Sequence, residues 1–119
     1  MFSGAPNASE IRCNTLATTG NLVTVPAGRW YTGNVSISAT VAVAGASNPV
    51  VTVNGTNSAP TAGTVVARLN LAGLALSTIS DTVTTEVIAK APSGNDITID
   101  FTAGANGTSS ATINGFVYG

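Results

Sequence analysis

The sequence contains no histidine, and only 8% of its 119 residues are charged. An ordinary soluble domain is about one-quarter Asp, Glu, Lys and Arg, so groups that exchange protons are scarce here. Histidine is the side chain that enzymes use most often to move protons near neutral pH. These absences argue against an enzyme, and we predict no catalytic residue.

Carboxylates are few as well, with five Asp and Glu in total. Asp96 and Asp100 lie on the same face of one expected strand, where four residues separate Cα atoms by about 13 Å. That distance is too long for a cooperating pair like the one in a retaining glycosidase. The favoured interpretation is that these charges keep an exposed strand soluble and discourage pairing at its edge.

Metal ligands are also scarce. Zinc and iron sites need clusters of His and Cys, and this chain has one cysteine and no histidine. Calcium needs converging oxygen ligands; Asn95, Asp96 and Asp81 would supply some if their loops met, but EF-hand spacing is absent. We therefore expect no metal and no cofactor.

The four basic residues, Arg12, Arg29, Arg68 and Lys90, are scattered along the chain. Nucleic-acid binding requires a cluster or stripe of basic side chains, and a membrane span requires about 18 consecutive apolar residues. Residues 1–7 lack the basic and apolar regions of a secretory signal. We expect no nucleic acid and no membrane as partners, and synthesis in the cytoplasm.

Cys13 is the only cysteine, so a disulfide within the chain is excluded. One interpretation is a bridge between subunits or a reactive thiol. The favoured interpretation is a small buried or tethered side chain, because free cysteine behaves as a small hydrophobic residue.

What the sequence does contain is alternation of β-branched or small apolar residues with Ser and Thr. The clearest run covers residues 35–43, where Val35, Ile37 and Ala39 share one face and Ser36 and Ser38 the other. Gly33-Asn34 is expected to be a turn, and Gly115 a bulge or a close contact. The expected strands cover residues 22–25, 29–32, 35–43, 50–53, 64–71, 82–89, 96–102 and 108–118, while 14–20 and 74–80 stay ambiguous.

In the strand over residues 64–71, Val65 is expected on the same face as Ala67, and Val66 on the other. Turns rich in Gly, Asn and Pro every 8–15 residues indicate an all-β fold. We predict an antiparallel β-sandwich or jelly roll of about eight strands, as a single domain over residues 15–119, with residues 1–14 as an extended N-terminal arm. Only 5% of residues are aromatic, so the core is expected to be thin and subunit contacts to supplement it.

Aromatic residues are the best candidates for such contacts. Trp30 and Tyr31 follow the turn at residues 26–28, and they suit either an interface or the core. A sugar-stacking platform is the less favoured alternative. The candidate interface residues are Phe2, Ile11, Trp30, Tyr31, Phe116 and Tyr118.

Two segments carry a resemblance to a known class of protein. They are the run Val-Thr-Val-Pro-Ala-Gly-Arg-Trp-Tyr-Thr-Gly-Asn-Val-Ser-Ile-Ser at residues 23–38 and the end Ser-Ala-Thr-Ile-Asn-Gly-Phe-Val-Tyr-Gly at residues 110–119. Both resemble small bacteriophage virion proteins, namely capsid decoration (cement) proteins and, next to these, the β-sandwich modules of tail fibres. The Thr/Ala/Gly/Asn/Val-rich remainder of the chain is similar in style, so the resemblance covers most of the chain and lies in its composition and in the alternation of its residue types.

The resemblance implies a non-enzymatic structural protein, commonly a homotrimer, that binds the major capsid protein on the capsid exterior and stabilises the virion surface. Residues 2–14 would then be the arm that docks on the shell. The alternative is a tail-fibre or adhesin module whose loops at residues 54–63 and 103–107 contact a host glycan. A chain that starts with its own Met and spans one domain favours decoration over a fibre module.

Overall fold

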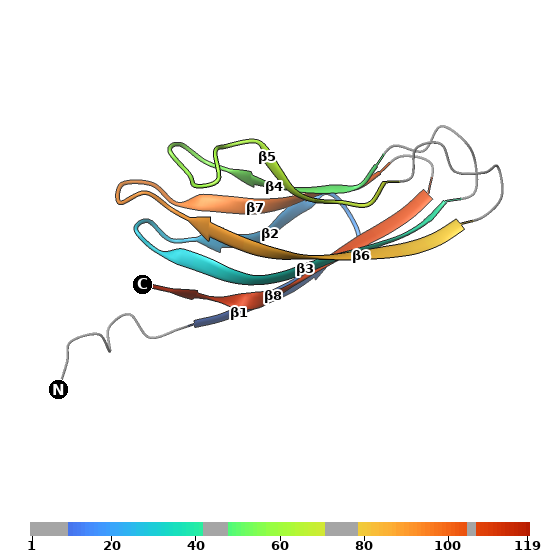
Figure 1. The fold of residues 1–119 in the computed structure, drawn as a ribbon, viewed down its shortest axis with the longest axis horizontal. Helices are drawn as coiled ribbons and strands as arrows, with labels where there is room; N and C mark the ends of the chain where they lie inside the picture. The colour runs from blue at the N-terminus through green and yellow to red at the C-terminus, as the bar shows by residue number, and fades with distance from the viewer. Residues whose placement is uncertain (1–9, 42–47, 71–78, 105–106) are drawn as a thin grey trace.

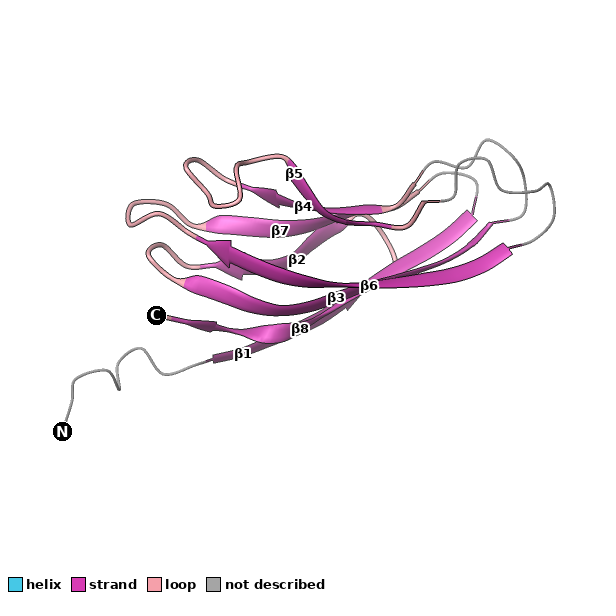
Figure 2. Ribbon diagram, viewed as in Figure 1, coloured by secondary structure: helices cyan, strands magenta, loops and turns pink. Residues whose placement is uncertain are grey.

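A computed structural model describes residues 10–41, 48–70, 79–104 and 107–119. These residues form eight β-strands and no helix (Figure 2). The strands are β1 (Glu10–Leu16), β2 (Gly20–Val25), β3 (Trp30–Val41), β4 (Val50–Asn54), β5 (Thr64–Arg68), β6 (Ile79–Lys90), β7 (Ile97–Thr102) and β8 (Gly107–Tyr118).

The strands form two four-stranded sheets that pack face to face, in the orders β1-β8-β3-β6 and β2-β7-β4-β5 (Figure 1). Every pairing is antiparallel. β1 pairs with β8, β2 with β7, β3 with β6 and β4 with β5. The chain therefore follows the path of one long hairpin, with its turn between β4 and β5, and successive strand pairs lie alternately in the two sheets. The predicted all-β, antiparallel sandwich is confirmed.

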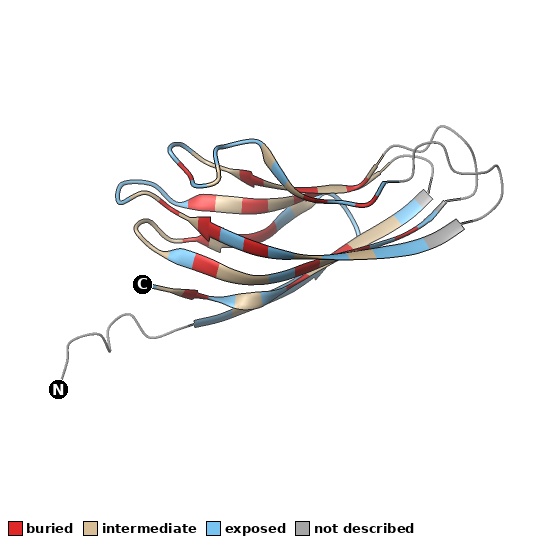
Figure 3. Cartoon of the chain, viewed as in Figure 1, coloured by how far each residue is buried: buried red, intermediate tan, exposed pale blue. Residues whose placement is uncertain are grey.

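The core lies between the two sheets, and buried residues alternate with more exposed ones along most of the strands (Figure 3). From β3 the buried side chains include Tyr31, Val35 and Ile37, and from β7 they include Ile99 and Phe101. Valine, alanine and isoleucine make up most of the rest of the core. Tyr31 and Phe101 are the largest fully buried side chains, so these two rings fill more of the core than any other residues.

A pair of glycines lets β3 and β8 approach closely. Gly33 lies opposite Gly115, and a Cβ atom on either residue would collide with the backbone of the other strand. A Cβ on Gly115 would also lie 2.6 Å from Tyr31 Oη, and this hydroxyl donates a hydrogen bond of 2.9 Å to the Arg12 carbonyl oxygen. The close contact expected at Gly115 is therefore present. The turn predicted at Gly33-Asn34 is wrong, because both residues lie inside β3.

Two further expectations differ from the structure. Residues 10–14, assigned to an extended arm, belong to β1, where they pair with β8; residues 1–9 lie outside the described part of the chain. In β5 a register shift against β4 leaves Val65 39% exposed and packs Val66 against the core, the reverse of the expected assignment. A β-bulge inserts one residue and so exchanges the two faces of a strand.

The contact between the two central strands can be tested with Gly115→Ala. The added methyl group has no space between the Thr32 carbonyl oxygen and the Tyr31 hydroxyl, so overpacking should lower the free energy of unfolding by about 1–3 kcal/mol. Gly94→Ala is the control, since no atom lies within 4 Å of its new Cβ. Urea unfolding measures both, and equal stabilities of the two variants would contradict the contact.

Burial, and secondly the nearby charge of Cys13, raises the pKa of Tyr31 from 10.0 to about 12. As the pH rises, the unfolded chain therefore loses the hydroxyl proton of Tyr31 at a lower pH than the folded chain. The contribution of the protonated Tyr31 to the free energy of unfolding is complete below pH 10, and it disappears between pH 10 and about 12. A difference of two pH units corresponds to about 3 kcal/mol. The unfolding free energy of the wild type should fall by this amount relative to that of Tyr31→Phe across this range. Parallel pH profiles for the two proteins would disprove the assignment.

Candidate protein interface

The outer surface of the β1-β8-β3-β6 sheet, here called the broad face, collects polar and apolar side chains in rows across the four strands. Glu86 and Lys90 are the only charged side chains among its described residues. The broad face comprises Ile11, Cys13, Thr15, Trp30, Thr32, Asn34, Ser36, Ser38, Thr40, Thr82, Thr84, Glu86, Ile88, Lys90, Thr108, Ser110, Thr112, Asn114, Phe116 and Tyr118.

Hydroxyl groups on neighbouring strands are hydrogen-bonded in pairs across much of this face. The pairs are Thr15–Thr112 at 2.9 Å, Ser36–Thr84 at 3.0 Å and Ser38–Thr82 at 3.0 Å between their hydroxyl oxygens. Cross-strand hydroxyl pairs of this kind contribute to the stability of a sheet. They also hold the side chains in fixed positions, so this part of the face presents ordered hydroxyls with almost no charge.

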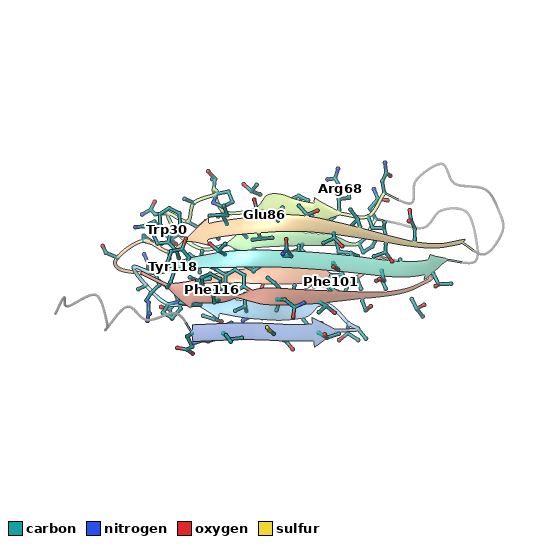
Figure 4. The ribbon with its side chains drawn as sticks, turned by 60° about the horizontal axis from the view of Figure 1, so that its bottom comes forward. Trp30, Arg68, Glu86, Phe101, Phe116 and Tyr118 are labelled. Atoms are coloured by element: carbon teal, nitrogen blue, oxygen red, sulfur yellow. The ribbon has the colours of Figure 1, made fainter. Side chains whose placement is uncertain are left out.

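Large apolar side chains gather at one end of the broad face, here called the apolar end and defined as Ile11, Trp30, Ile88, Phe116 and Tyr118. Four of these five side chains are exposed: Ile11 is 79% exposed, Ile88 50%, Phe116 38% and Trp30 37%. Ile11 lies directly opposite Phe116, and Trp30 lies directly opposite Tyr118. Figure 4 shows Trp30, Phe116 and Tyr118 together at this end of the sheet.

The aromatic rings of the apolar end are held by one another. Trp30 and Tyr118 are stacked with centroids 6.4 Å apart and planes at 16°, and Phe116 lies 5.5 Å from Tyr118. Thr32 Oγ1 donates a hydrogen bond of 3.0 Å to Tyr118 Oη. Because β8 and β6 flank β3, Tyr118 and Lys90 lie on opposite sides of Trp30, with Lys90 Nζ 5.7 Å from its ring centroid. A sugar that stacked on Trp30 would have to displace one of these neighbours.

The structure separates the residues predicted to form an interface. Ile11, Trp30, Phe116 and Tyr118 come together at the apolar end from three strands. Tyr31 does not belong with them, because successive side chains of a strand point to opposite faces and its ring is fully buried. Phe2 lies outside the described residues.

Sequence reasoning missed Ile88 as part of the apolar end. Its strand carries apolar residues on both faces, at Val87 and at Ile88, so the pattern alone did not tell which side was buried. The signal that would have identified it is the alternation Glu86, Ile88, Lys90, because two charges on one face mark that face as the exposed one.

Cys13 also lies on the broad face, opposite Asn114. We expected a buried or tethered side chain. The expectation that it is buried is wrong, because the thiol is exposed. The physical reason is the position of β1 at the edge of its sheet, where residues 11, 13 and 15 point outward.

The carboxylates considered as catalytic or metal-binding groups have structural partners instead. Asp96 Oδ1 accepts a hydrogen bond of 2.9 Å from the Ala27 amide. Asp100 Oδ2 accepts hydrogen bonds from Asn54 Nδ2 at 2.6 Å and from Thr98 Oγ1 at 2.9 Å. These bonds fix a turn and the outer surface of the β2-β7-β4-β5 sheet.

The calcium ligands considered above are not brought together. Asp81 lies opposite Ala39, toward the far end of β3, whereas Asp96 contacts the turn before β3. Among the residues that the structure describes, no group of three or more His, Cys, Asp or Glu is placed to hold a metal ion.

An open groove of about 620 Å³ lies at the end of the β1-β8-β3-β6 sheet away from the apolar end, and residues of both faces of the sheet line it, among them Ala39 and Ser109 of the inner face. Ser38, Thr40, Thr82 and Ser110 are among the side chains that line it, with Asp81 as its only ionisable group. Asp81 Oδ1 accepts a hydrogen bond of 2.8 Å from the Thr82 amide. Within the described residues this groove therefore offers hydroxyls and one carboxylate already held by the backbone, which suits contact with a polar surface.

Comparison of the chain with protein-family models, with curated proteins and with solved structures found no match. The described part of the chain contains no helix that is long and apolar enough to cross a membrane.

The exposure of Cys13 makes the broad face accessible to a chemical probe. In dilute, folded protein we expect a thiol reagent such as DTNB to label Cys13 at a rate within about tenfold of that for the urea-unfolded chain. Cys13→Ser, which has no thiol, sets the background. Labelling that occurs only after unfolding would contradict the position of Cys13 on this face.

Proposed function

We propose that this chain is a non-enzymatic structural protein of a bacteriophage virion, which binds the outside of the capsid as a homotrimer and stabilises the assembled shell. The broad face is the observation that carries the proposal. It combines ordered hydroxyls, two charged side chains and an apolar end with fixed aromatic rings. Such a surface suits contact with protein, and we assign the apolar end to contact between copies of this chain.

The order of the strands supports a jelly roll as the finer description of the sandwich. A jelly roll has eight strands in two sheets and contains two Greek keys, and viral capsid domains are among the proteins that use it. The hairpin-like pairing of β1 with β8, β2 with β7, β3 with β6 and β4 with β5 fits this description. Because many functions share one fold, the broad face carries more weight in the proposal than the topology.

The apolar end supports a contact between copies on energetic grounds. Clustered, exposed apolar side chains mark contact surfaces, and aromatic residues dominate their binding energy. Fully burying a large apolar side chain is worth about 1.5–3 kcal/mol. The rings of Trp30, Phe116 and Tyr118 already hold one another in place, so little side-chain entropy remains to be lost on binding.

The low charge of the broad face bears on how the protein would act on a shell. A contact with few charges is little affected by salt screening, and it does not require charged groups to lose their hydration. A protein that binds only the assembled shell stabilises that state by mass action. Many copies arranged with the symmetry of the shell would add avidity to contacts that are individually modest.

A glycan-binding adhesin module is supported less well. The loops expected to contact the glycan follow β4 and β7. In the β4–β7 pair Asn54 lies opposite Thr98 and Val50 lies opposite Thr102, so the loop over residues 54–63 and the segment at residues 103–104 leave the sandwich at opposite ends. These loops do not form one site. Tyr118 and Lys90 also flank the Trp30 ring, so a sugar would have to compete with them for it.

Co-sedimentation with capsids that lack the protein tests the proposal. The double variant Ile11→Thr/Phe116→Thr removes apolar area from two strands, and we expect it to lose the trimer in native mass spectrometry and to lower shell binding at least tenfold. Val65→Thr is the matched control, because Val65 is 39% exposed but lies on the other sheet. It should bind like the wild type.

Two results would overturn the proposal. One is a wild-type chain that does not sediment with such capsids. The other is a double variant that keeps both the trimer and wild-type binding. Saturable binding of the wild type to a glycan array, without binding to shells, would favour the adhesin instead.

A further inference from the structure

The four edges of the two sheets differ in how their unpaired backbone groups are protected. β1 and β6 are the edges of one sheet, and β2 and β5 are the edges of the other. An edge strand exposes N–H and C=O groups that can pair with another chain, and proteins normally block such pairing with short strands, bulges, charges or covering groups.

The β1/β2 side of the sandwich has several of these protections. Arg12 Nη1 donates a hydrogen bond of 3.3 Å to the Thr24 carbonyl oxygen, and Asn14 Nδ2 donates one of 3.1 Å to the Leu22 carbonyl oxygen. Side chains of β1 therefore occupy carbonyl groups of β2. In addition, β1 carries the Glu10–Arg12 ion pair, and β2 has a register shift between Asn21 and Val23.

Of the two edges on the opposite side, β5 is short and irregular, whereas β6 is long and regular and carries Asp81 and Lys90 near its ends with Glu86 between them. β5 has only five residues, a register shift against β4 and the exposed Arg68. β6 has twelve residues and pairs with β3 without a register shift. Between Thr82 and Ile88 it contains no proline or glycine, and its only charged residue is Glu86.

Among the residues that the structure describes, the free edge of β6 is blocked at Lys90. The Lys90 amide donates a hydrogen bond of 2.6 Å to the Ala59 carbonyl oxygen, and the Ala59 amide donates one of 3.0 Å to the Lys90 carbonyl oxygen. Lys90 therefore directs both backbone groups away from β3. In an antiparallel pair this direction alternates from residue to residue, so Thr82, Thr84, Glu86 and Ile88 also direct theirs to the free edge.

We propose that this edge pairs with β6 of a second copy of the chain, antiparallel and about a two-fold axis, with Thr84 opposite Thr84 of the second copy. The contact is self-complementary, since each strand offers the same N–H and C=O groups to the other. Two four-stranded sheets become one sheet of eight strands, and the two broad faces become continuous.

The position of Ala59 limits the register. Ala59 pairs with Lys90 on this edge, so no residue of the second copy can pair with Lys90. With Thr84 opposite Thr84, Ile88 faces Ser80 and no described residue of β6 has to face Lys90; this is the longest pairing of the two strands that Ala59 leaves open. If Thr84 instead faced Glu86, Ser80 of one copy would face Lys90 of the other, in the position that Ala59 already occupies.

Charge favours the same register. Glu86 of one copy faces Thr82 of the other, whose hydroxyl can donate a hydrogen bond to a carboxylate. A register with Glu86 opposite Glu86 would place like charges directly across from each other, which destabilises a strand pair. The contact goes beyond the proposed function, because it is a two-fold contact at the sheet edge and not the contact of the apolar end.

Thr84→Pro tests the contact, since proline removes an N–H that points away from β3 and is tolerated on such an edge. In native mass spectrometry we expect an even number of chains for the wild type, and half that number for Thr84→Pro. Thr84→Val is the control, because it also lacks the hydroxyl that bonds Ser36 but keeps the N–H; it should behave like the wild type. Circular dichroism and the melting temperature check that each variant is folded.

A pair of charge variants tests the register. Within one chain, positions 82 and 86 are about 13 Å apart, but across the proposed axis Thr82 faces Glu86. We expect Thr82→Glu to raise the dissociation constant at least tenfold relative to Thr82→Lys, which places a cation beside the carboxylate. Both variants lose the same hydrogen bond to Ser38.

Hydrogen exchange by NMR gives a direct measurement. The measurement is made at concentrations where the wild type pairs. The amides of Thr82, Glu86 and Ile88 should then exchange at least tenfold more slowly in the wild type than in folded Thr84→Pro, and the amide of Thr84 in the wild type should be equally slow. The proposal is overturned by a chain number that Thr84→Pro does not change, by equal effects of the two charge variants, or by fast exchange of these amides in the wild type. Shell binding is a separate measurement, so this proposal and the proposed function fail independently.

Discussion

The sheet that carries the broad face depends on the close approach of β3 and β8 at Gly33 and Gly115. Without side chains at these two positions, the Tyr31 ring can cross β8 on the inner side of the sheet and bond the Arg12 carbonyl oxygen of β1. One phenol thus connects β3 to the edge strand two positions away. Because side chains alternate along a strand, the backbone that buries Tyr31 also holds its neighbour Trp30 on the outside, beside Tyr118. The core contact and the surface cluster are two results of one local geometry.

The scarcity of charge has consequences for both the stability and the surface of the protein. Hydroxyl pairs such as Ser36–Thr84 and Ser38–Thr82 take the positions that ion pairs would occupy on an ordinary sheet. A surface of this kind loses little hydration energy when another protein covers it, but it also provides little repulsion between copies. Protection of the sheet edges then falls to specific side chains. Arg12 and Asn14 supply it to β2, and β6 has no equivalent among the described residues.

The features that could be predicted correctly are those that depend on residues close together in the chain. The alternation in residues 35–39 and 97–101 identified strands and their buried faces correctly, because one side of each strand is consistently apolar. The predictions were wrong where residues far apart in the chain determine the local structure. Gly33 resembles a turn residue until it is known that it faces Gly115, and β1 is recognisable as a strand only by its pairing with β8.

The same limit applied to the candidate interface. Trp30 and Tyr31 were both named, and only the alternation along β3 places Trp30 on the surface and Tyr31 in the core.

The two contacts proposed for this protein are compatible because of the direction of the strands. The apolar end lies where β6 ends at Lys90 and β3 begins at Trp30. In an antiparallel β6–β6 pair the two Lys90 ends point away from each other, so the two apolar ends lie at opposite ends of the joined face. Pairing at the edge therefore leaves both apolar ends open for contact with further copies. A two-fold contact and a three-fold contact that use separate surfaces can act together, and this combination allows a layer of neutral sheets to extend over a shell.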